Sequence, residues 1–158
     1  MPVETRWLIR GRVIFSQALG DVSRVNFDLF IADIDALMHE RTGEIHFVQD
    51  LRMLTQPNSN FNNVRKLLRV MRGFDGWYLQ FGQDENPVLR FLMSTSAKML
   101  NIRTRPIYPD YASLRAFLAG YDPELALPVK PLLYFSDADL QAHLPQDMID
   151  KIEREDET

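Results

Sequence analysis

The chain has no cysteine in its 158 residues, which excludes disulfide bonds and thiolate metal sites. It has no run near the roughly 20 apolar residues that cross a membrane, and its first residues contain no apolar stretch typical of a signal peptide. It also lacks an excess of positive charge, since the formal net charge is -4, and this disfavours nucleic acid as a partner. We therefore expect a cytoplasmic protein that does not contact a membrane.

Apolar residues are plentiful by comparison. They make up 46% of the chain, which is enough for a buried core and unlike the composition of a disordered protein. A chain of this length fits one domain with additional segments.

Strand and helix patterns alternate along the chain after a β-rich start. Residues 5–18 contain two β-forming segments on either side of Gly11, which predicts either a hairpin or one long bent strand pair. Amphipathic and β-forming segments then follow one another to residue 121. The predicted strands are residues 45–51, 77–81 and 103–108, and the predicted helices begin near residues 24, 61, 87 and 111. This order predicts an α/β fold, with a single mixed, mostly parallel sheet of about five strands and four packed helices.

Two features refine this prediction. Pro106 lies inside the last predicted strand and has no N–H for a central ladder, so we expect that strand at an edge of the sheet. The third helix is expected to bury one stripe of residues at helical spacing. These residues are Val88, Phe91, Leu92, Thr95 and Met99.

The stretch from Glu44 to Asn63 is where we expect function. It reads as an inner strand, a polar loop and the start of a helix, and partners commonly meet an α/β sheet at such a strand end. Asp50 ends the strand, and the loop that follows carries the other candidate partner-binding residues. These are Arg52, Thr55 and Ser59.

A basic row follows on the second predicted helix. Arg65, Arg69 and Arg72 recur at i, i+4 and i+7, and Lys66 lies beside them. One interpretation is a solvated helix face. The other is a basic patch, completed by Lys66 and Arg52, that docks an acidic partner or a phosphate, because arginine forks suit carboxylates and phosphates. Nucleic acid is the weaker version, because no aromatic residues are interleaved with these arginines.

Carboxylates raise a second hypothesis. Asp50 follows one strand, and Asp84 and Glu85 follow the next, so these side chains would converge if the strands are parallel. Such a cluster binds Mg²⁺ and supports phosphoryl transfer. The alternative is that they are loop acids and helix caps. Because the sequence has neither a nucleotide-binding motif nor a histidine pair at ligand spacing, we predict no catalytic residues, no metal and no cofactor.

The order of elements over residues 5–120 resembles that of STAS domains, the anti-sigma-factor-antagonist type. The resemblance also rests on the strand end Val48-Gln49-Asp50 and on Gly76-Trp77 at the start of the next strand. It implies a non-enzymatic regulator that binds protein partners. Members with a phosphorylation switch carry Asp-Ser-Ser-Gly after this strand. Here Arg52 stands at the phosphoacceptor position, so the resemblance does not carry the switch to this chain.

The chain changes character after Tyr121. We predict a STAS-like domain over residues 1–120 and a partly docked extension over residues 121–158, with one short helix near residues 137–144 and a frayed, charged end. As a whole, the sequence indicates a regulatory or protein-interaction module without catalysis. The alternative is a small metal-assisted phosphoryl-transfer enzyme, and homodimer formation is a further open alternative.

Overall fold

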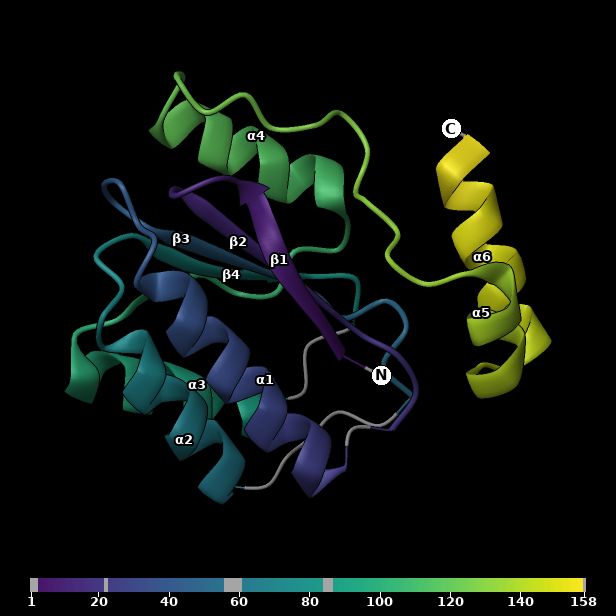
Figure 1. Cartoon of the computed structure of the whole chain (residues 1–158), viewed down its shortest axis with the longest axis horizontal. Helices are drawn as coiled ribbons and strands as arrows, with labels where there is room; N and C mark the ends of the chain where they lie inside the picture. The colour runs from purple at the N-terminus through teal and green to yellow at the C-terminus, as the bar shows by residue number, and fades with distance from the viewer. Residues whose placement is uncertain (1–2, 22, 56–60, 84–86, 158) are drawn as a thin grey trace.

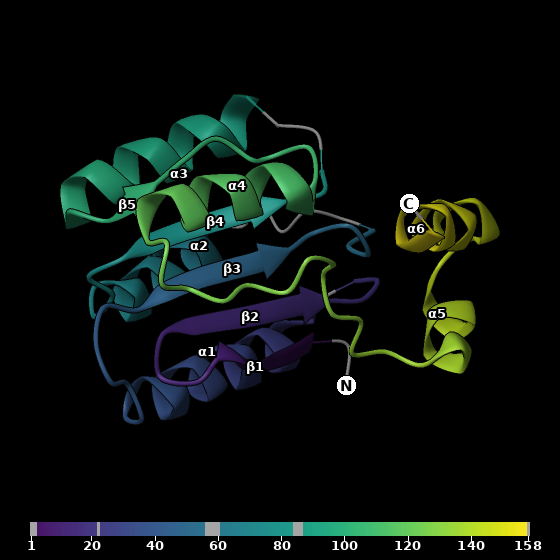
Figure 2. The ribbon, with the colours of Figure 1, turned by 90° about the horizontal axis from the view of Figure 1, so that it is seen from above.

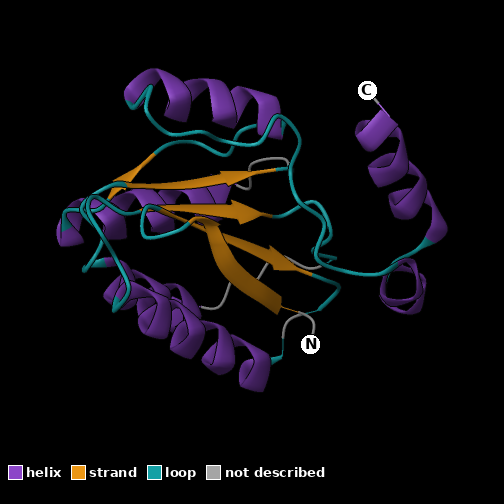
Figure 3. Ribbon diagram, turned by 45° about the horizontal axis from the view of Figure 1, so that its top comes forward, coloured by secondary structure: helices purple, strands orange, loops and turns teal. Residues whose placement is uncertain are grey.

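The fold is a five-stranded sheet with helices on both faces, as the computed structural model of the chain shows (Figure 3). The structure describes residues 3–21, 23–55, 61–83 and 87–157. Strands lie in the order β1 (Val3–Ile9), β2 (Val13–Ala18), β3 (His46–Asp50), β4 (Trp77–Phe81) and β5 (Arg103–Thr104). Only β1 is antiparallel to its neighbour, so the predicted mixed, mostly parallel sheet is confirmed.

The central strands are buried on both faces, as is typical of parallel sheets covered by helices. All six residues of β2 are buried, and Phe47 and Val48 of β3 have no exposed surface. The hairpin between β1 and β2 turns at Gly11, whose φ of 75° favours glycine. Strand β3 therefore lies inside the sheet, and its carboxyl end opens toward the segment predicted to carry function.

Three helices form one layer against one face of the sheet (Figures 1 and 2). They are α1 (Arg24–Met38), α2 (Phe61–Met71) and α3 (Pro87–Leu100), and α2 lies between the other two. Their buried residues share one core with the inner side chains of the sheet, such as Ile14, Phe47 and Tyr78. Ser23 accepts a hydrogen bond from the N–H of Asn26 and so caps α1, as the sequence indicates.

The other face is covered by α4 (Tyr111–Tyr121) and by the connector that follows it (Figure 2). Leu114 and Leu118 of α4, with Leu125 and Leu127 of the connector, pack against Phe15 and its neighbours in the sheet. The connector thus acts as part of a layer, because it covers apolar surface that α4 alone leaves open.

Two predictions about the elements are wrong. Strand β5 covers two residues instead of six, because Pro106 interrupts the ladder and only an isolated bridge joins Phe81 to Tyr108, although β5 does lie at the sheet edge. The predicted buried stripe of α3 is also wrong, since Phe91 is 67% exposed and Met99 is 81% exposed. Ala97 is buried instead, because α3 lies at the end of its layer and presents a narrower face to the core.

The C-terminal extension forms two helices, α5 (Asp137–His143) and α6 (Gln146–Glu157), beside the carboxyl ends of the parallel strands (Figure 2). The predicted short helix is present, with Ser136 and Asp139 forming a capping box. The frayed end is not, because α6 buries Ile149 and Ile152. These helices share a small core with Leu19 and Met53 of the sheet domain. The domain division at residue 120 stays a prediction.

Candidate functional site

Asp50 is the centre of the site at the end of β3. Its carboxylate is fully buried and accepts hydrogen bonds from Gln17 Nε2 (2.8 Å) and from the backbone N–H of Arg52 (3.0 Å). The Arg52 guanidinium donates to both carboxylate oxygens, with Nε 3.0 Å from Oδ1 and Nη2 2.8 Å from Oδ2. A buried charge is tolerated when it is paired and hydrogen-bonded in this way. Asp50 is therefore a structural anchor with its oxygens already engaged.

Arg52 is buried as well, with 8% of its side chain exposed. Burial alone would lower the pKa of Arg52, but the hydrogen bond and the charge of Asp50 outweigh it, so the pKa is raised above its ordinary value. The guanidinium also lies 3.5 Å from Glu155 of α6 and faces the ring of Phe81. Gly82 allows this placement, because its φ is 97° and a Cβ there would lie 2.3 Å from Arg52 Cγ.

Gln17 connects this pair to the extension. Its amide is fully buried and donates to both Asp50 and the carbonyl of Leu132, while its Oε1 accepts from the N–H of Tyr134 (2.8 Å). The side chain thus satisfies backbone groups of the connector as a neighbouring strand would. Sequence reasoning missed Gln17, and the available signal was the polar pair Ser16 and Gln17 inside a strand whose other residues are apolar.

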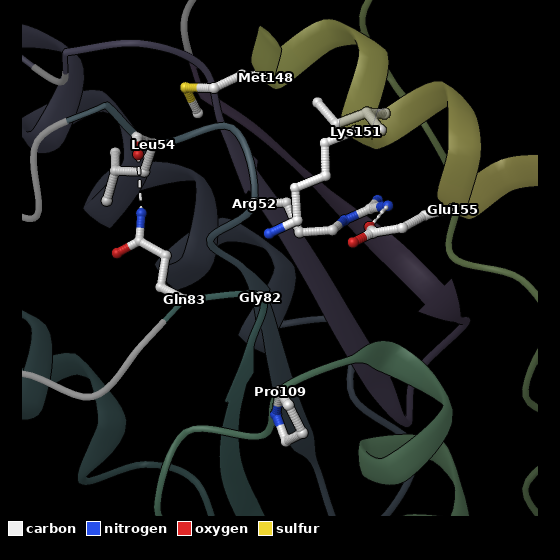
Figure 4. A pocket seen from close by; sticks show the side chains of 9 residues that line it. Arg52, Leu54, Gly82, Gln83, Pro109, Met148, Lys151 and Glu155 are labelled. Carbon is white, nitrogen blue, oxygen red and sulfur yellow. Dashed lines mark hydrogen bonds and ion pairs between the residues drawn. The ribbon is translucent and has the colours of Figure 1, made fainter.

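A pocket of about 440 Å³ lies beside Arg52, between α6 and the carboxyl ends of β3 and β4 (Figure 4). Its walls come from the loops after β3 and β4, from the residue before the α4 cap, and from α6. The lining residues are Arg52, Leu54, Gly82, Gln83, Pro109, Met148, Lys151, Ile152 and Glu155. Gln83 Nε2 donates to the carbonyl of Leu54 (2.8 Å) and fixes that wall. This pocket was not predicted from the sequence, because the segment that forms α6 was expected to be frayed.

The basic row lies elsewhere, on the outer side of α2. Arg65, Arg69 and Arg72 are exposed, and within the described residues none of them forms an ion pair. Lys66 is different, because its ammonium lies 3.2 Å from Asp28 of α1. Arg65 and Arg69 occupy the flank of α2 that turns away from α1, as their helical spacing to Lys66 requires, and Arg72 follows directly after the last residue of the helix.

The structure describes only one of the remaining candidates. Thr55 is exposed and donates its hydroxyl hydrogen to Asp21 (2.9 Å). Ser59, Asp84 and Glu85 lie outside the described residues, so the predicted convergence of carboxylates is untested. Among residues 3–21, 23–55, 61–83 and 87–157, no three histidine or carboxylate side chains are grouped to hold a metal ion. None of the described helices is long and apolar enough to span a membrane.

His46 has a structural role at the opposite end of β3. Its ring is fully buried, its Nδ1 accepts the N–H of Trp77 (3.0 Å), and its Nε2 lies 3.2 Å from Glu44. Burial lowers the pKa of His46, and the charge of Glu44 opposes this effect only in part. The imidazole therefore stays neutral and completes the backbone hydrogen bonding between β3 and β4.

Taken together, the sheet order, the helix layers and the loop after β3 define a STAS-like α/β fold. No family model matches the chain, and no curated protein matches it. Among solved structures, it is similar to the anti-sigma factor antagonist SpoIIAA in its unphosphorylated form. The TM-score is 0.51 at 14% sequence identity, over 76% of this chain and 98% of that chain. This similarity confirms the predicted fold and leaves about a quarter of the chain without a counterpart.

Proposed function

We propose that this protein is a non-enzymatic regulatory module that captures an acidic protein partner through α2 and the loop before it. The observation that carries the proposal is the row formed by Arg65, Arg69 and Arg72. These side chains are exposed and have no ion pair within the described residues, in a chain whose formal net charge is -4. A concentrated basic row on an acidic protein favours a partner with complementary charge.

The scaffold beneath the row suits a docking surface. Leu67, Leu68 and Met71 anchor the inner side of α2 in the core, so the outer side is held rigidly. Exposed guanidinium groups on a fixed helix are well placed to receive carboxylates in a bidentate manner. Thr55 precedes α2 in the chain and is exposed, and we propose that it and Ser59 belong to the same docking surface.

The similarity to SpoIIAA supports the regulatory part of the proposal, since that protein is an anti-sigma factor antagonist. The geometry of Asp50 supports the absence of catalysis. Its carboxylate oxygens are occupied by Gln17 and Arg52, which leaves little capacity for the metal that the phosphoryl-transfer alternative requires. We further propose that the protein is cytoplasmic. The alternative partner is a second copy of the chain.

A charge-reversal experiment tests the proposal. Arg65→Glu with Arg69→Glu should weaken capture of acidic proteins from a lysate of the native host and remove most of its salt dependence, because exposed charges act mainly on the association rate. Arg65→Lys with Arg69→Lys keeps the charge and is the matched control, and Arg10→Glu reverses an exposed charge elsewhere. Unchanged capture by a folded Glu variant would show that the row is only a solvated face.

A further inference from the structure

The pocket between α6 and the carboxyl ends of β3 and β4 has the features of a ligand site that is separate from the basic row. We propose that it binds a small organic anion with a compact apolar body, and that the bound anion links α6 to the sheet domain. The proposal does not depend on the proposed partner, because none of the α2 arginines lines this pocket.

The location is the first argument. The pocket lies at the carboxyl ends of the parallel strands β3 and β4, where open α/β sheets place their ligands. Its volume of about 440 Å³ falls within the range of small-molecule sites. Both the sheet domain and the extension contribute walls, so a ligand there would contact both.

Charge is the second argument. Figure 4 shows the Lys151 side chain reaching from α6 past Arg52, with its ammonium on the side that faces Leu54 and Gln83. Within the described residues this ammonium has no ion pair. Of the two other charged lining groups, the Arg52 guanidinium is paired with the buried Asp50 carboxylate and also lies 3.5 Å from Glu155. Lys151 is therefore the cation of the pocket lining that has no ion pair within the described residues.

The remaining lining decides the kind of anion. Leu54, Met148, Ile152 and Pro109 supply apolar surface, with Ile152 buried. The Gln83 amide donates an N–H to the carbonyl of Leu54, and Figure 4 shows its oxygen turned away from Lys151. An apolar wall with a few convergent polar groups is typical of sites for small organic molecules. We infer one acidic group facing Lys151 and a small ring or branched chain against the apolar wall.

The chain offers its own reporter for this site. The methyl group of Met148 lies in the pocket wall, whereas Met99 is 81% exposed on α3. Methyl NMR of the full chain labelled at methionine can therefore follow binding, with Met99 as the internal reference. The probe is phenyl phosphate. Inorganic phosphate provides the charge without the ring, and benzyl alcohol provides the ring without the charge.

Phenyl phosphate should shift the Met148 methyl resonance in a saturable way at millimolar concentration, and both partial probes should bind at least about tenfold more weakly. Lys151→Gln should weaken phenyl phosphate by about tenfold or more, because it removes a charge-assisted hydrogen bond. Arg10→Gln removes an exposed charge next to the turn between β1 and β2, outside both the pocket and the basic row, and should change nothing. The proposal is overturned if phenyl phosphate causes no saturable shift of Met148. It is equally overturned if benzyl alcohol binds as well, or if Lys151→Gln binds unchanged, since the pocket would then lack anion selectivity.

Discussion

The buried pair of Asp50 and Arg52 allows the effect of one substitution on the free energy of unfolding to be predicted. Arg52→Met removes the guanidinium and leaves the Asp50 carboxylate in a fully buried position. The carboxylate keeps its hydrogen bonds from Gln17 and from the backbone N–H of residue 52. Breaking a buried pair costs about 3–5 kcal/mol, and the two remaining donors place this substitution near the lower end, at ~3 kcal/mol. For a chain of this length, that loss lowers Tm by about 6–12 °C.

The double substitution Asp50→Leu with Arg52→Met separates charge pairing from packing. It removes both charges together, so it should cost only about 1 kcal/mol, because apolar replacements of buried pairs are often neutral. The Gln17 amide still has the carbonyl of Leu132 as an acceptor in that variant. Urea denaturation, monitored by circular dichroism, gives the unfolding free energies for the complete double-mutant cycle.

The control for this cycle is Arg69→Met, which removes an exposed arginine and should change stability by less than ~0.5 kcal/mol. If the double variant loses as much stability as the sum of Arg52→Met and Asp50→Leu, the two side chains are not coupled and the reasoning fails. It also fails if Arg52→Met is as stable as Arg69→Met.

Three further predictions concern the same framework. Gly82→Ala should lower the unfolding free energy by about 1–3 kcal/mol, because alanine is strained at this positive φ and its Cβ would clash with Arg52. Chemical denaturation measures this loss, and a variant as stable as the wild type would contradict the prediction. Gln17→Leu should speed proteolytic cleavage of the connector, which loses its hydrogen bonds to residues 132 and 134, and an unchanged cleavage rate would count against that role. Burial lowers the pKa of His46 in the folded protein. As the pH falls below about 6.5, His46 is therefore protonated in the unfolded chain before it is protonated in the folded one, and the free energy of unfolding should decrease. Denaturation at several pH values tests this, and His46→Gln should flatten the profile.

The central sheet was predictable because its signals are local and consistent. Apolar strands separated by amphipathic helices admit few arrangements, and caps such as Ser23, Asp110 and Ser136 mark where helices begin. The exposed face of α3 was not predictable in this way. Periodicity identifies a stripe of apolar residues, but the neighbouring helices decide how much of that stripe is covered, which is why Phe91 and Met99 stay exposed.

The site was predictable only in part. The exposed arginines of α2 follow from spacing, since Leu68 and Met71 fix which side of the helix is buried. The burial of Arg52 does not follow, because it depends on α6, a segment distant in sequence. The pattern that marks α6 is faint: Ile149 and Ile152 are spaced for one helix face but are surrounded by charge. Long-range contacts of this kind leave little trace in local composition.

The docking of α5 and α6 on the sheet domain has a consequence for how any binding constant is interpreted. The extension is covalently tethered to the surface that it covers on the sheet domain. Its local concentration at that surface is on the order of millimolar, whatever the protein concentration. Its contacts with Leu19 and Met53 therefore need only modest intrinsic strength to keep it seated. A molecule that requires the surface beneath α6 competes with this occupant, and its apparent affinity for the full chain falls by the fraction of time the surface is covered.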